Sequence, residues 1–333
     1  MSFGLCIVGC GEYTDLFMSN IKGIPEGVDL FFASLNIDLS KKFCDKYGGV
    51  GYFGDTESAA KDPRANAMYF ITPHDVHLEN VALAARFKKD ILLEKPIARN
   101  LDEGKQIAEI VRNSDVKCMI AENFRFLPIV LTAKQLINSG AIGDMRIVHI
   151  NWINREIELF KEWTWRNDLE KCGGGRFIDG GIHCVDLLVN LIGLPSTVFA
   201  LSSISSIPTL EGEDSITLLC KNSSDVIGLI NYCDSSPVSS NTPTNVKVQG
   251  TTGELKFNLG DSNLVLSRLD EDEDIYSNPG HGMDQILDEF LACSREGKKV
   301  EMDCEQGLND LAIVMAAYES SKTSTAVNME YSF

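Results

Sequence analysis

The sequence predicts an α/β protein with two parts: an N-terminal doubly wound parallel sheet, and a C-terminal α+β domain with a large, open, mixed and mostly antiparallel sheet. Over the first 123 residues, short continuous apolar segments alternate with longer amphipathic ones, a pattern typical of parallel strands covered by helices on both faces. From about residue 145, strand-like segments follow one another with few helices between them. The length of 333 residues is sufficient for two such domains.

The first domain is expected over residues 1–123. Its strands are predicted at 3–8, 29–34, 67–72, 91–94 and 116–122, with helices at 40–47, 77–87 and 101–113. The second domain is expected over residues 124–333. Its helices are predicted at 128–139, 182–192, 283–295 and 305–322, and its strands at 145–153, 197–204, 215–220, 226–233, 245–250 and 254–257. The acidic run at 270–274 is expected to be a solvated loop tip.

Composition and charge restrict the partners. A net charge of -18 disfavours nucleic acid and anionic membrane surfaces, so a small-molecule partner is expected. The 10 cysteines show no CxxC pair and no zinc-type spacing. They indicate buried thiols in a reducing compartment and no metal site. The chain shows no signal-peptide pattern and no apolar run of membrane-helix length, which favours a cytoplasmic protein.

A glycine-containing turn follows the first predicted strand. Gly9-Cys10-Gly11-Glu12-Tyr13 carries the first two glycines of a G-x-G-x-x-G pattern, which brings a pyrophosphate close to a helix N-terminus. Thr14 stands where the third glycine is usual. Because this turn lies at the first strand–helix junction of the alternating pattern, we interpret these five residues as part of a dinucleotide site.

The end of the second strand normally carries an acid that binds the adenosine ribose. Here the segment runs from Ser34 through Asn36 to Asp38, with no acid at the expected position and no arginine. Asp38 is also suited to cap the following helix. Ser34 and Asn36 are expected near the cofactor, and both NAD and NADP remain open. The absence of a nearby cation slightly favours NAD.

Polar groups follow three further strands. They are Thr72-Pro73 with His77, then Glu94-Lys95-Pro96, and then Glu122-Asn123 with Arg125. Ligands of open α/β sheets bind beyond the carboxyl ends of the strands. Thr72, Pro73, His77, Glu94, Lys95 and Asn123 are therefore expected at the cofactor.

At this point the sequence resembles the Gfo/Idh/MocA oxidoreductases, named for glucose–fructose oxidoreductase and inositol dehydrogenase. The resemblance rests on VGCG (8–11), ITPHDVH (71–77), EKP (94–96), ENFRF (122–126), GGGRFIDGGIHCVDLL (173–188) and GTTGEL (250–255). It implies a Rossmann domain, a C-terminal α/β domain, and hydride transfer between a nicotinamide and a hydroxyl carbon of a sugar or cyclitol. It also implies a homodimer or homotetramer formed through the C-terminal sheet. The EKP lysine matches Lys95, and a cis bond before this proline is common in the family.

A second group of polar residues is Asp179, His183 and Asp186, spaced i, i+4 and i+7, so that a helix places them on one face. Asp179 as a helix cap and His183 as a core residue are alternatives. The family's D-x-G-x-H pattern favours function. A histidine with a pKa of about 6.5 suits proton transfer better than a lysine with one of about 10.4. We expect His183 to be the acid/base, Asp179 to orient it, and cationic Lys95 to polarise the reacting oxygen. Asp186 is expected either to support the catalytic residues without touching the substrate or to be structural.

Substrate contacts are expected from Lys95, Asp179 and His183, together with Arg125, Trp165 and Arg166; Trp163, Arg176 and Asn123 are further candidates. Aromatic faces and guanidinium groups suit a sugar ring or a carboxylate. The alternative is that the tryptophans lie in the core. Two other functions remain open: a cofactor-bound regulatory or sensor protein, and a redox-neutral NAD-dependent glycosidase on the same fold.

Overall fold

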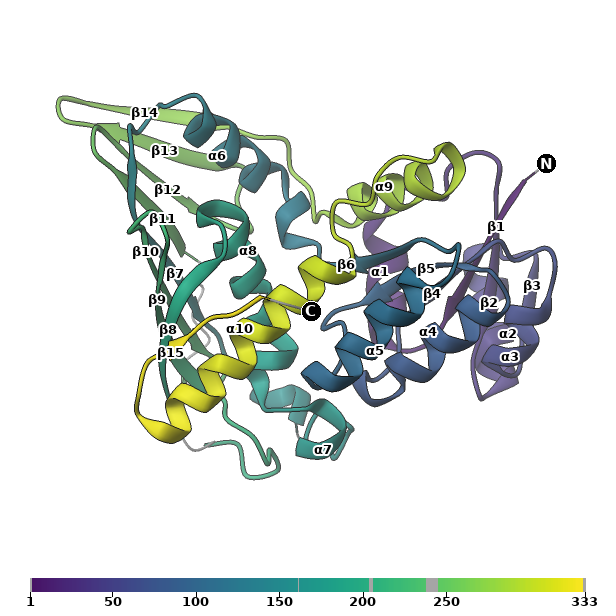
Figure 1. Cartoon of the computed structure of the whole chain (residues 1–333). Coiled ribbons are helices and arrows are strands. Elements are labelled where there is room, and N and C mark those ends of the chain that lie inside the picture. Colours follow the sequence, from purple (N-terminus) through teal and green to yellow (C-terminus); the bar gives the residue numbers. More distant parts are fainter. Residues whose placement is uncertain (1, 161, 204–205, 238–244, 332–333) are drawn as a thin grey trace. The chain divides into compact units, whose positions relative to one another are not determined.

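The computed structural model describes residues 2–160, 162–203, 206–237 and 245–331 (Figure 1). The chain divides into two compact units. The first unit comprises Met1–Glu122 with Met283–Leu308, and the second comprises Asn123–Gly282 with Asn309–Phe333. The ten cysteines are free thiols, and all but the half-buried Cys233 are buried. Each unit is described separately below.

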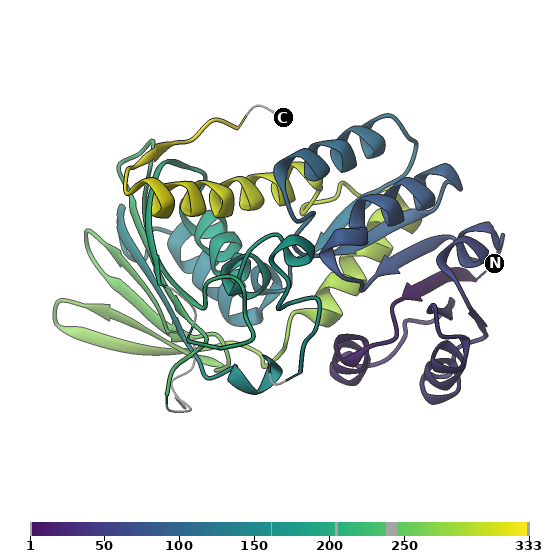
Figure 2. The same ribbon diagram turned by 90° about the horizontal axis from the view of Figure 1, so that it is seen from below.

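The first unit contains a six-stranded parallel sheet with strand order β3-β2-β1-β4-β5-β6. The strands are β1 (Phe3–Val8), β2 (Val28–Ala33), β3 (Gly51–Phe53), β4 (Ala67–Phe70), β5 (Asp90–Glu94) and β6 (Cys118–Ala121). The helices are α1 (Glu12–Asn20), α2 (Ile37–Tyr47), α3 (Thr56–Lys61), α4 (His77–Arg86) and α5 (Leu101–Arg112). Helices α4 and α5 cover one face of the sheet, and α1 and α2 the other (Figure 2). The predicted doubly wound sheet is confirmed.

The strands of this sheet are continuously apolar because helices cover both of its faces. All four residues of β4 are buried, as are four of the five residues of β5. The short strand β3 was not predicted. Its three residues are half-buried or exposed, so it has no continuous apolar run to reveal it.

One helix departs from the expected domain boundary. Helix α9 (Met283–Glu296) was expected in the second domain but belongs to the first unit. It packs against α1, and Asp284 accepts a hydrogen bond from the backbone N–H of Lys22 at 2.7 Å. The chain therefore returns to its first unit before α10 (Cys304–Thr323), the last long helix.

The turn between β1 and α1 depends on its two glycines in different ways. Gly9 has φ +101, and a Cβ there would lie 2.0 Å from the Ile71 carbonyl oxygen. Only glycine fits that close approach. A Cβ on Gly11, at the start of α1, would meet no atom within 4 Å. Thr14 is fully buried, and its hydroxyl donates to the Gly9 carbonyl at 2.5 Å. The replacement of the third glycine is therefore accommodated by a hydrogen bond.

The second unit contains a nine-stranded sheet with order β14-β13-β12-β11-β7-β10-β9-β8-β15. Its strands are β7 (Met145–Ile153), β8 (Pro195–Ser203), β9 (Ser215–Asn222), β10 (Ile227–Cys233), β11 (Asn245–Gly250), β12 (Glu254–Asn258), β13 (Asn263–Arg268), β14 (Glu271–Tyr276) and β15 (Val327–Asn328). Every neighbouring pair is antiparallel except β7 and β10, which are parallel. The predicted mixed, mostly antiparallel sheet is confirmed.

The prediction of a loop tip at 270–274 was wrong, because residues 271–274 lie in β14. This edge strand pairs with β13 through its backbone, and its acidic side chains are exposed. A strand at an edge needs no apolar face, and exposed charges keep such an edge from pairing with other chains. Strand β13 was also missed, although its buried residues Leu264 and Leu266 alternate with half-buried ones.

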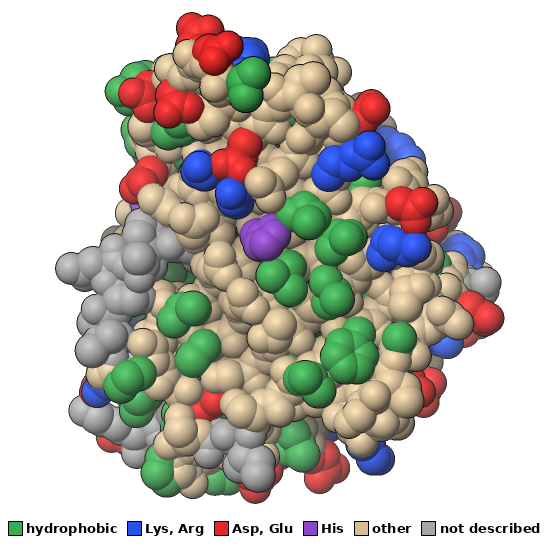
Figure 3. Space-filling model, turned by 90° about the vertical axis from the view of Figure 1, so that its left-hand side faces the viewer, with side chains coloured by type: hydrophobic (Ala, Val, Ile, Leu, Met, Phe, Trp, Pro, Cys, Tyr) green, Lys and Arg blue, Asp and Glu red, His purple; other side chains and the backbone are tan. Residues whose placement is uncertain are grey.

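The two faces of the second sheet differ. Helices α6 (Pro128–Asn138) and α8 (Ile182–Ile192) contact strands of the sheet, and the short helix α7 (Leu169–Cys172) precedes α8. Buried residues alternate with half-buried or exposed ones along β8, β9 and β10. Exposed large hydrophobic residues on these strands and β7 include Ile153, Leu201, Leu219 and Ile227. The face seen in Figure 3 carries many such hydrophobic side chains.

The two glycines of the β1–α1 turn provide a stability test. We expect Gly9→Ala to lower the free energy of unfolding by roughly 2–4 kcal/mol or to prevent folding, because the methyl group meets a backbone oxygen at a positive φ. Gly11→Ala should change it by less than about 1 kcal/mol. Thermal unfolding of both variants measures this. Equal losses would contradict the assigned difference between the two positions.

Candidate active site

In the first unit, the predicted cofactor residues follow neighbouring strands. The sheet order places β2, β1, β4 and β5 side by side, and all are parallel, so their carboxyl ends share one edge. Gly9 and Gly11 follow β1, Thr72 and Pro73 follow β4, and Lys95 follows β5. Topology therefore assembles residues separated by up to 86 positions in the sequence.

His77 connects two of these strand ends. Its imidazole is fully buried, with Nδ1 3.0 Å from the Pro96 carbonyl oxygen and Nε2 3.1 Å from that of Thr72. Burial lowers its pKa. Asn80 donates to the Thr72 hydroxyl at 3.0 Å. We therefore interpret His77 as holding the segments after β4 and β5 together, rather than presenting its ring to a ligand as the sequence suggested.

Glu94, the last residue of β5, is buried beside its neighbour Lys95. Its carboxylate accepts a hydrogen bond from the Tyr69 hydroxyl at 2.5 Å. Burial raises the pKa of Glu94 to about 7, a rise that the charge of Lys95 and the Tyr69 hydrogen bond partly oppose. Glu94 was expected to contact the cofactor, which stays a prediction; in the structure its carboxyl group binds Tyr69. Lys95 is half-buried and precedes Pro96 through a cis peptide bond.

The segment after β2 is arranged by local hydrogen bonds. The side-chain oxygen of Asn36 accepts from the backbone N–H groups of Asp38 and Leu39 at 3.1 and 3.4 Å, so Asn36 caps α2. The Ser34 hydroxyl accepts from the Asn36 N–H at 3.2 Å. Asp38 lies in the first turn of α2 rather than at its cap. The expected cofactor residue Asn36 therefore has a structural task as well.

The remaining predicted residues around α1 differ in exposure. Cys10 is buried, its thiol lies 3.6 Å from the Ala33 carbonyl, and burial raises its pKa to about 12. Glu12 is exposed and Tyr13 half-exposed in the first turn of α1. Asn123 belongs to the second unit, where its side-chain amide donates to the His281 carbonyl at 3.0 Å.

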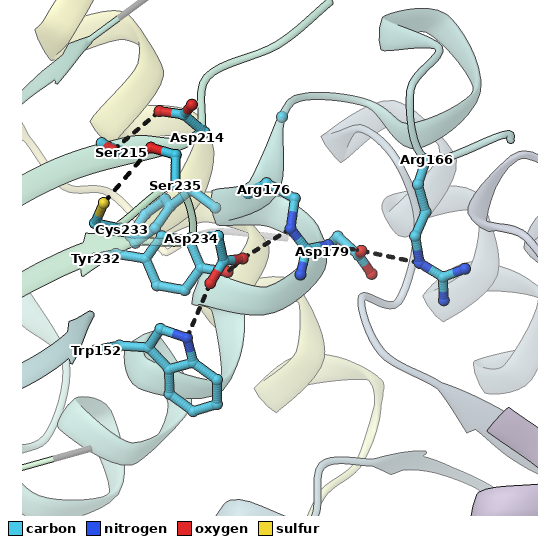
Figure 4. Close-up of polar contacts among 12 residues, drawn as sticks. Trp152, Arg166, Arg176, Asp179, Asp214, Ser215, Tyr232, Cys233, Asp234 and Ser235 are labelled. Carbon is cyan, nitrogen blue, oxygen red and sulfur yellow. Dashed lines mark hydrogen bonds and ion pairs between the residues drawn. The ribbon is translucent and has the colours of Figure 1, made fainter. Parts of the chain in front are cut away.

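In the second unit, Asp179 lies in a π-helical turn over Phe177–Gly181 that leads into α8. The alternative that Asp179 caps α8 is wrong, because Gly181 occupies the cap and no side chain caps that helix. Arg166 Nε donates to Asp179 Oδ2 at 3.1 Å, and Arg176 Nη1 donates to the same oxygen (Figure 4). Two guanidinium groups therefore hold one carboxylate oxygen.

His183 occupies the first turn of α8 and is half-exposed. Its ring stacks on Phe124, with centroids 4.4 Å apart and planes 17° apart. Phe124 in turn stacks on Trp152, and Trp152 on Tyr232. This aromatic column restricts the orientation of the imidazole without enclosing it.

Arg125 and Asp186 form an ion pair. Asp186 is fully buried, and Arg125 Nε lies 3.0 and 3.2 Å from its two carboxylate oxygens, with Nη2 completing the contact. The burial of Asp186 agrees with its expected structural role. The guanidinium of Arg125, expected to contact substrate, is engaged in this pair.

The tryptophans of the 161–168 segment are not core residues. Trp163 is 58% exposed and Trp165 is half-exposed. The Arg166 guanidinium lies over the Trp165 ring, 4.3 Å from its centroid, a stacking contact that arginine commonly makes. Trp165 and Arg166 thus form an amphipathic surface next to Asp179.

Sequence reasoning missed four residues of the second unit: Phe124, Trp152, Tyr232 and Asp234. Trp152 and Tyr232 are paired in the parallel register of β7 and β10, so their proximity depends on strand pairing. The one available signal was Asp234 itself, a charged residue directly after the apolar strand β10.

Among the described residues, no group of three or more His, Cys, Asp or Glu side chains could hold a metal ion. No helix in the same part of the chain is long and apolar enough to cross a membrane.

The raised pKa of Glu94 predicts a pH-dependent contribution to stability. The folded chain holds the proton up to about pH 7, whereas an unfolded glutamate releases it at its ordinary value of 4.5. The free energy of unfolding should therefore fall by roughly 3 kcal/mol as pH rises through this window, and change no further above it. Glu94→Gln should lack this loss, and Glu109→Gln, on the exposed side of α5, should retain it. Urea unfolding between pH 4.5 and 8 measures the difference; parallel curves for wild type and Glu94→Gln would contradict it.

Comparisons with known proteins identify the family. The NAD-binding Rossmann model of an oxidoreductase family matches residues 3–122, and the C-terminal alpha/beta model of the same family matches residues 134–329. A D-xylose 1-dehydrogenase [NADP(+)] of Haloarcula marismortui is 26% identical over 82% of this chain and 77% of its own length. Mouse trans-1,2-dihydrobenzene-1,2-diol dehydrogenase is 26% identical over 74% of this chain and 72% of its own.

Solved structures show the same fold. Levoglucosan dehydrogenase in complex with NADH and levoglucosan superposes with a TM-score of 0.90 at 22% identity, covering 99% of this chain and 100% of that one. The expectations of an oxidoreductase and of an NAD(P)-binding fold are thereby confirmed. The chain belongs to the Gfo/Idh/MocA oxidoreductase family.

Proposed function

We propose that this protein is an NAD(P)-dependent dehydrogenase or reductase that transfers hydride between the nicotinamide and a secondary alcohol or ketone carbon of a sugar, cyclitol or related small polyol. The observation that carries the proposal is the strand-end edge of the first unit. There, Gly11 follows β1 and has space where a side chain would be, and Lys95 follows β5. Both lie in the part of the chain that matches the NAD-binding model of the family. Relatives named for D-xylose, dihydrodiol and levoglucosan oxidation support the substrate class.

The residues at this edge fit a dinucleotide. Gly11 precedes α1 with no side chain capping the helix and no atom where its Cβ would be. The first N–H groups of a helix bind phosphate oxygens. Gly9, Cys10, Gly11, Glu12 and Tyr13 would therefore hold the pyrophosphate. When bound, the nicotinamide supplies the carbon that accepts or donates the hydride.

The residues after β2 favour NAD over NADP. Ser34, Leu35 and Asn36 provide no cation for a 2′-phosphate, and Asp38 adds a negative charge in the following turn. NADP sites generally use an arginine at this position. Lys41 and Lys42 lie farther along α2 and are exposed. The relatives include an NADP(+) enzyme and an NADH complex, so the preference follows from this chain's own residues.

Proton transfer is assigned to His183 and polarisation to Lys95. In the oxidation direction the substrate O–H bond breaks, His183 takes the proton, and the O–H electron pair forms the C=O double bond. The hydrogen of the carbon leaves with both electrons as hydride, which a bound nicotinamide would accept. The Lys95 ammonium stabilises the negative charge that develops on the substrate oxygen. We assign Asp179, whose carboxylate is held beside α8 by Arg166 and Arg176, to orient His183 together with the aromatic column.

Trp165 and Arg166 are suited to bind a sugar ring. An aromatic face packs against the C–H face of a ring, and guanidinium N–H groups donate to its hydroxyls. Because Arg166 uses Nε on Asp179 and stacks on Trp165, its position is fixed before a substrate arrives.

Thr72 and Pro73, after β4, would contact the nicotinamide ring.

The open face of the second unit's sheet supports a homo-oligomer. It presents Leu201, Leu219 and Ile227, all at least one-third exposed, on adjacent strands. Contiguous exposed hydrophobic residues mark protein–protein interfaces, and a second copy of this chain offers the same surface in return. We expect a dimer or tetramer by light scattering, and a monomer would exclude this assembly.

A screen of the purified protein against sugars, cyclitols and polyols tests the function. We expect one equivalent of NADH per substrate oxidised, with NAD at least as effective as NADP. Turnover of a glycoside without net NADH would identify a redox-neutral glycosidase instead. Cofactor binding with no turnover of any compound, in either direction, would favour a sensor.

Lys95→Met tests the polarising role. Methionine keeps roughly the length of the side chain and removes the charge, so the chemical step should slow by about 10²–10³-fold. Folding and cofactor affinity should persist, because Ile91, Leu92 and Leu93 provide the packing of β5. Lys61→Met, on the exposed side of α3, is the control. Loss of cofactor binding together with activity would assign Lys95 to the cofactor site alone.

A further inference from the structure

Arg176 is a buried cation placed between two carboxylates. Its side chain is 8% exposed, Nη1 donates to Asp179 Oδ2, and Nε donates to Asp234 Oδ2 at 2.8 Å (Figure 4). Asp179 belongs to the turn before α8, and Asp234 directly follows β10. The guanidinium therefore connects the candidate catalytic segment to the sheet.

Asp234 is fixed from several directions. The Tyr232 hydroxyl donates to Oδ2 and the Trp152 indole N–H to Oδ1 at 3.1 Å; that N–H also faces the side-chain amide of Asn154. The Asp234 backbone N–H donates to the Asp214 carbonyl at 3.0 Å, and its own carbonyl accepts from the Glu156 N–H at 2.8 Å. These contacts fix the position of the Asp234 carboxylate at the end of β10.

The turn that carries Asp179 is shaped to reach this support. A Cβ on Gly180 would lie 2.2 Å from the Tyr232 hydroxyl and 3.2 Å from Arg176 Nη2. The absence of a side chain at Gly180 lets the turn approach the Tyr232–Asp234–Arg176 group closely. Gly180 therefore allows the close approach that lets Asp179 bind Arg176.

The charges of the group are balanced. Arg166 and Arg176 provide two positive charges, and Asp179 and Asp234 two negative ones. A buried cation that loses one partner is strongly destabilised, because its charge is then uncompensated. Because Asp234 is held at the end of β10, the Arg176 guanidinium has one favourable position. Its N–H group therefore meets the Asp179 carboxylate from a fixed direction.

We propose that Asp234 is a positioning residue that acts through Arg176 to hold the Asp179 carboxylate in its working orientation. The proposal rests on the proposed function, in which Asp179 orients His183. Asp234 itself touches Arg176, Tyr232 and Trp152. The contacts with Tyr232 and Trp152 also reach the aromatic column beside His183. The charge of Asp234, in contrast, acts on Arg176, so we expect removal of that charge alone to change turnover mainly through Asp179.

Asp234→Asn in the full-length protein tests this, because the amide keeps the shape of the side chain and removes its charge. We expect kcat to fall by about 10–100-fold with the KM for the cofactor unchanged, the scale of a small misplacement of a catalytic group. Asp214→Asn is the matched control. Asp214 is equally buried and its carbonyl accepts from the Asp234 N–H where β9 begins and β10 ends, but its carboxylate accepts from Ser206 and Ser215. It should keep kcat within about twofold of wild type.

The decisive comparison is with Asp179→Asn. If Asp234 acts through Asp179, the double variant Asp179→Asn/Asp234→Asn should be no slower than Asp179→Asn alone. A further 10-fold loss in the double variant, or an equal kcat loss in Asp214→Asn, would overturn the proposal. If Asp234→Asn does not fold, Tyr232→Phe removes one hydrogen bond to the same carboxylate and should show the same dependence on Asp179 with a smaller loss, roughly 2–10-fold.

Absence of turnover in the wild type would refute the proposed function rather than the connection between the two aspartates. The connection is then measured by melting temperature. The Tm decrease caused by Asp234→Asn should shrink when Asp179 is already Asn, because Arg176 has then lost the partner that Asp234 positions it for. Strictly additive Tm decreases would overturn the proposal on this measurement as well.

Discussion

The ion pairs of Arg176 with Asp179 and Asp234 are the interaction on which the candidate site of the second unit depends. A guanidinium with so little exposure is stable only where carboxylates surround it. That requirement holds Asp179, in the turn before α8, close to Asp234 at the end of β10. The aromatic column starts from the same place, because Tyr232 both donates to Asp234 and stacks on Trp152. The orientation of His183 and that of Asp179 thus depend on one pair of adjacent strands, β7 and β10.

The first unit solves a similar problem differently. Glu94 ends a buried strand beside Lys95, and an ionised carboxylate there would be costly. Burial raises its pKa to about 7, and Tyr69 supplies a hydrogen bond, so near neutral pH the group carries only part of a charge. His77 then joins the Thr72 and Pro96 carbonyls. A charged pair at the end of an apolar strand is therefore tolerated because one member can be protonated and the following segment is tied to its neighbour.

Local pattern was sufficient wherever a feature depends on neighbouring residues. Continuous apolar runs predicted the parallel strands. The spacing of Asp179 and His183 predicted one helical segment for both, whereas Asp179 lies in the π-helical turn that leads into α8 and His183 lies in α8 itself. Where a feature depends on pairing between distant segments, the sequence carried little information. Asp234 lies 55 positions beyond Asp179, and only the register of β10 with β7 brings its supporting tryptophan to it. Likewise β14 has no apolar face to detect, because an edge strand is held by its backbone.

The departures from the dinucleotide fingerprint show which parts of that pattern are structural. Thr14 replaces a glycine whose usual role is close packing of helix on strand, and its hydroxyl restores the contact by binding the Gly9 carbonyl. Gly9 has no such substitute, because a backbone oxygen occupies the place of its side chain. After β2, Asn36 uses its side chain to cap α2. In this chain Thr14 therefore meets the packing requirement of the third glycine. No acid stands at the expected position after β2 to bind the adenosine ribose, so the fingerprint does not identify the residues that make this contact. Cofactor choice is therefore the property of this site on which family membership is least informative.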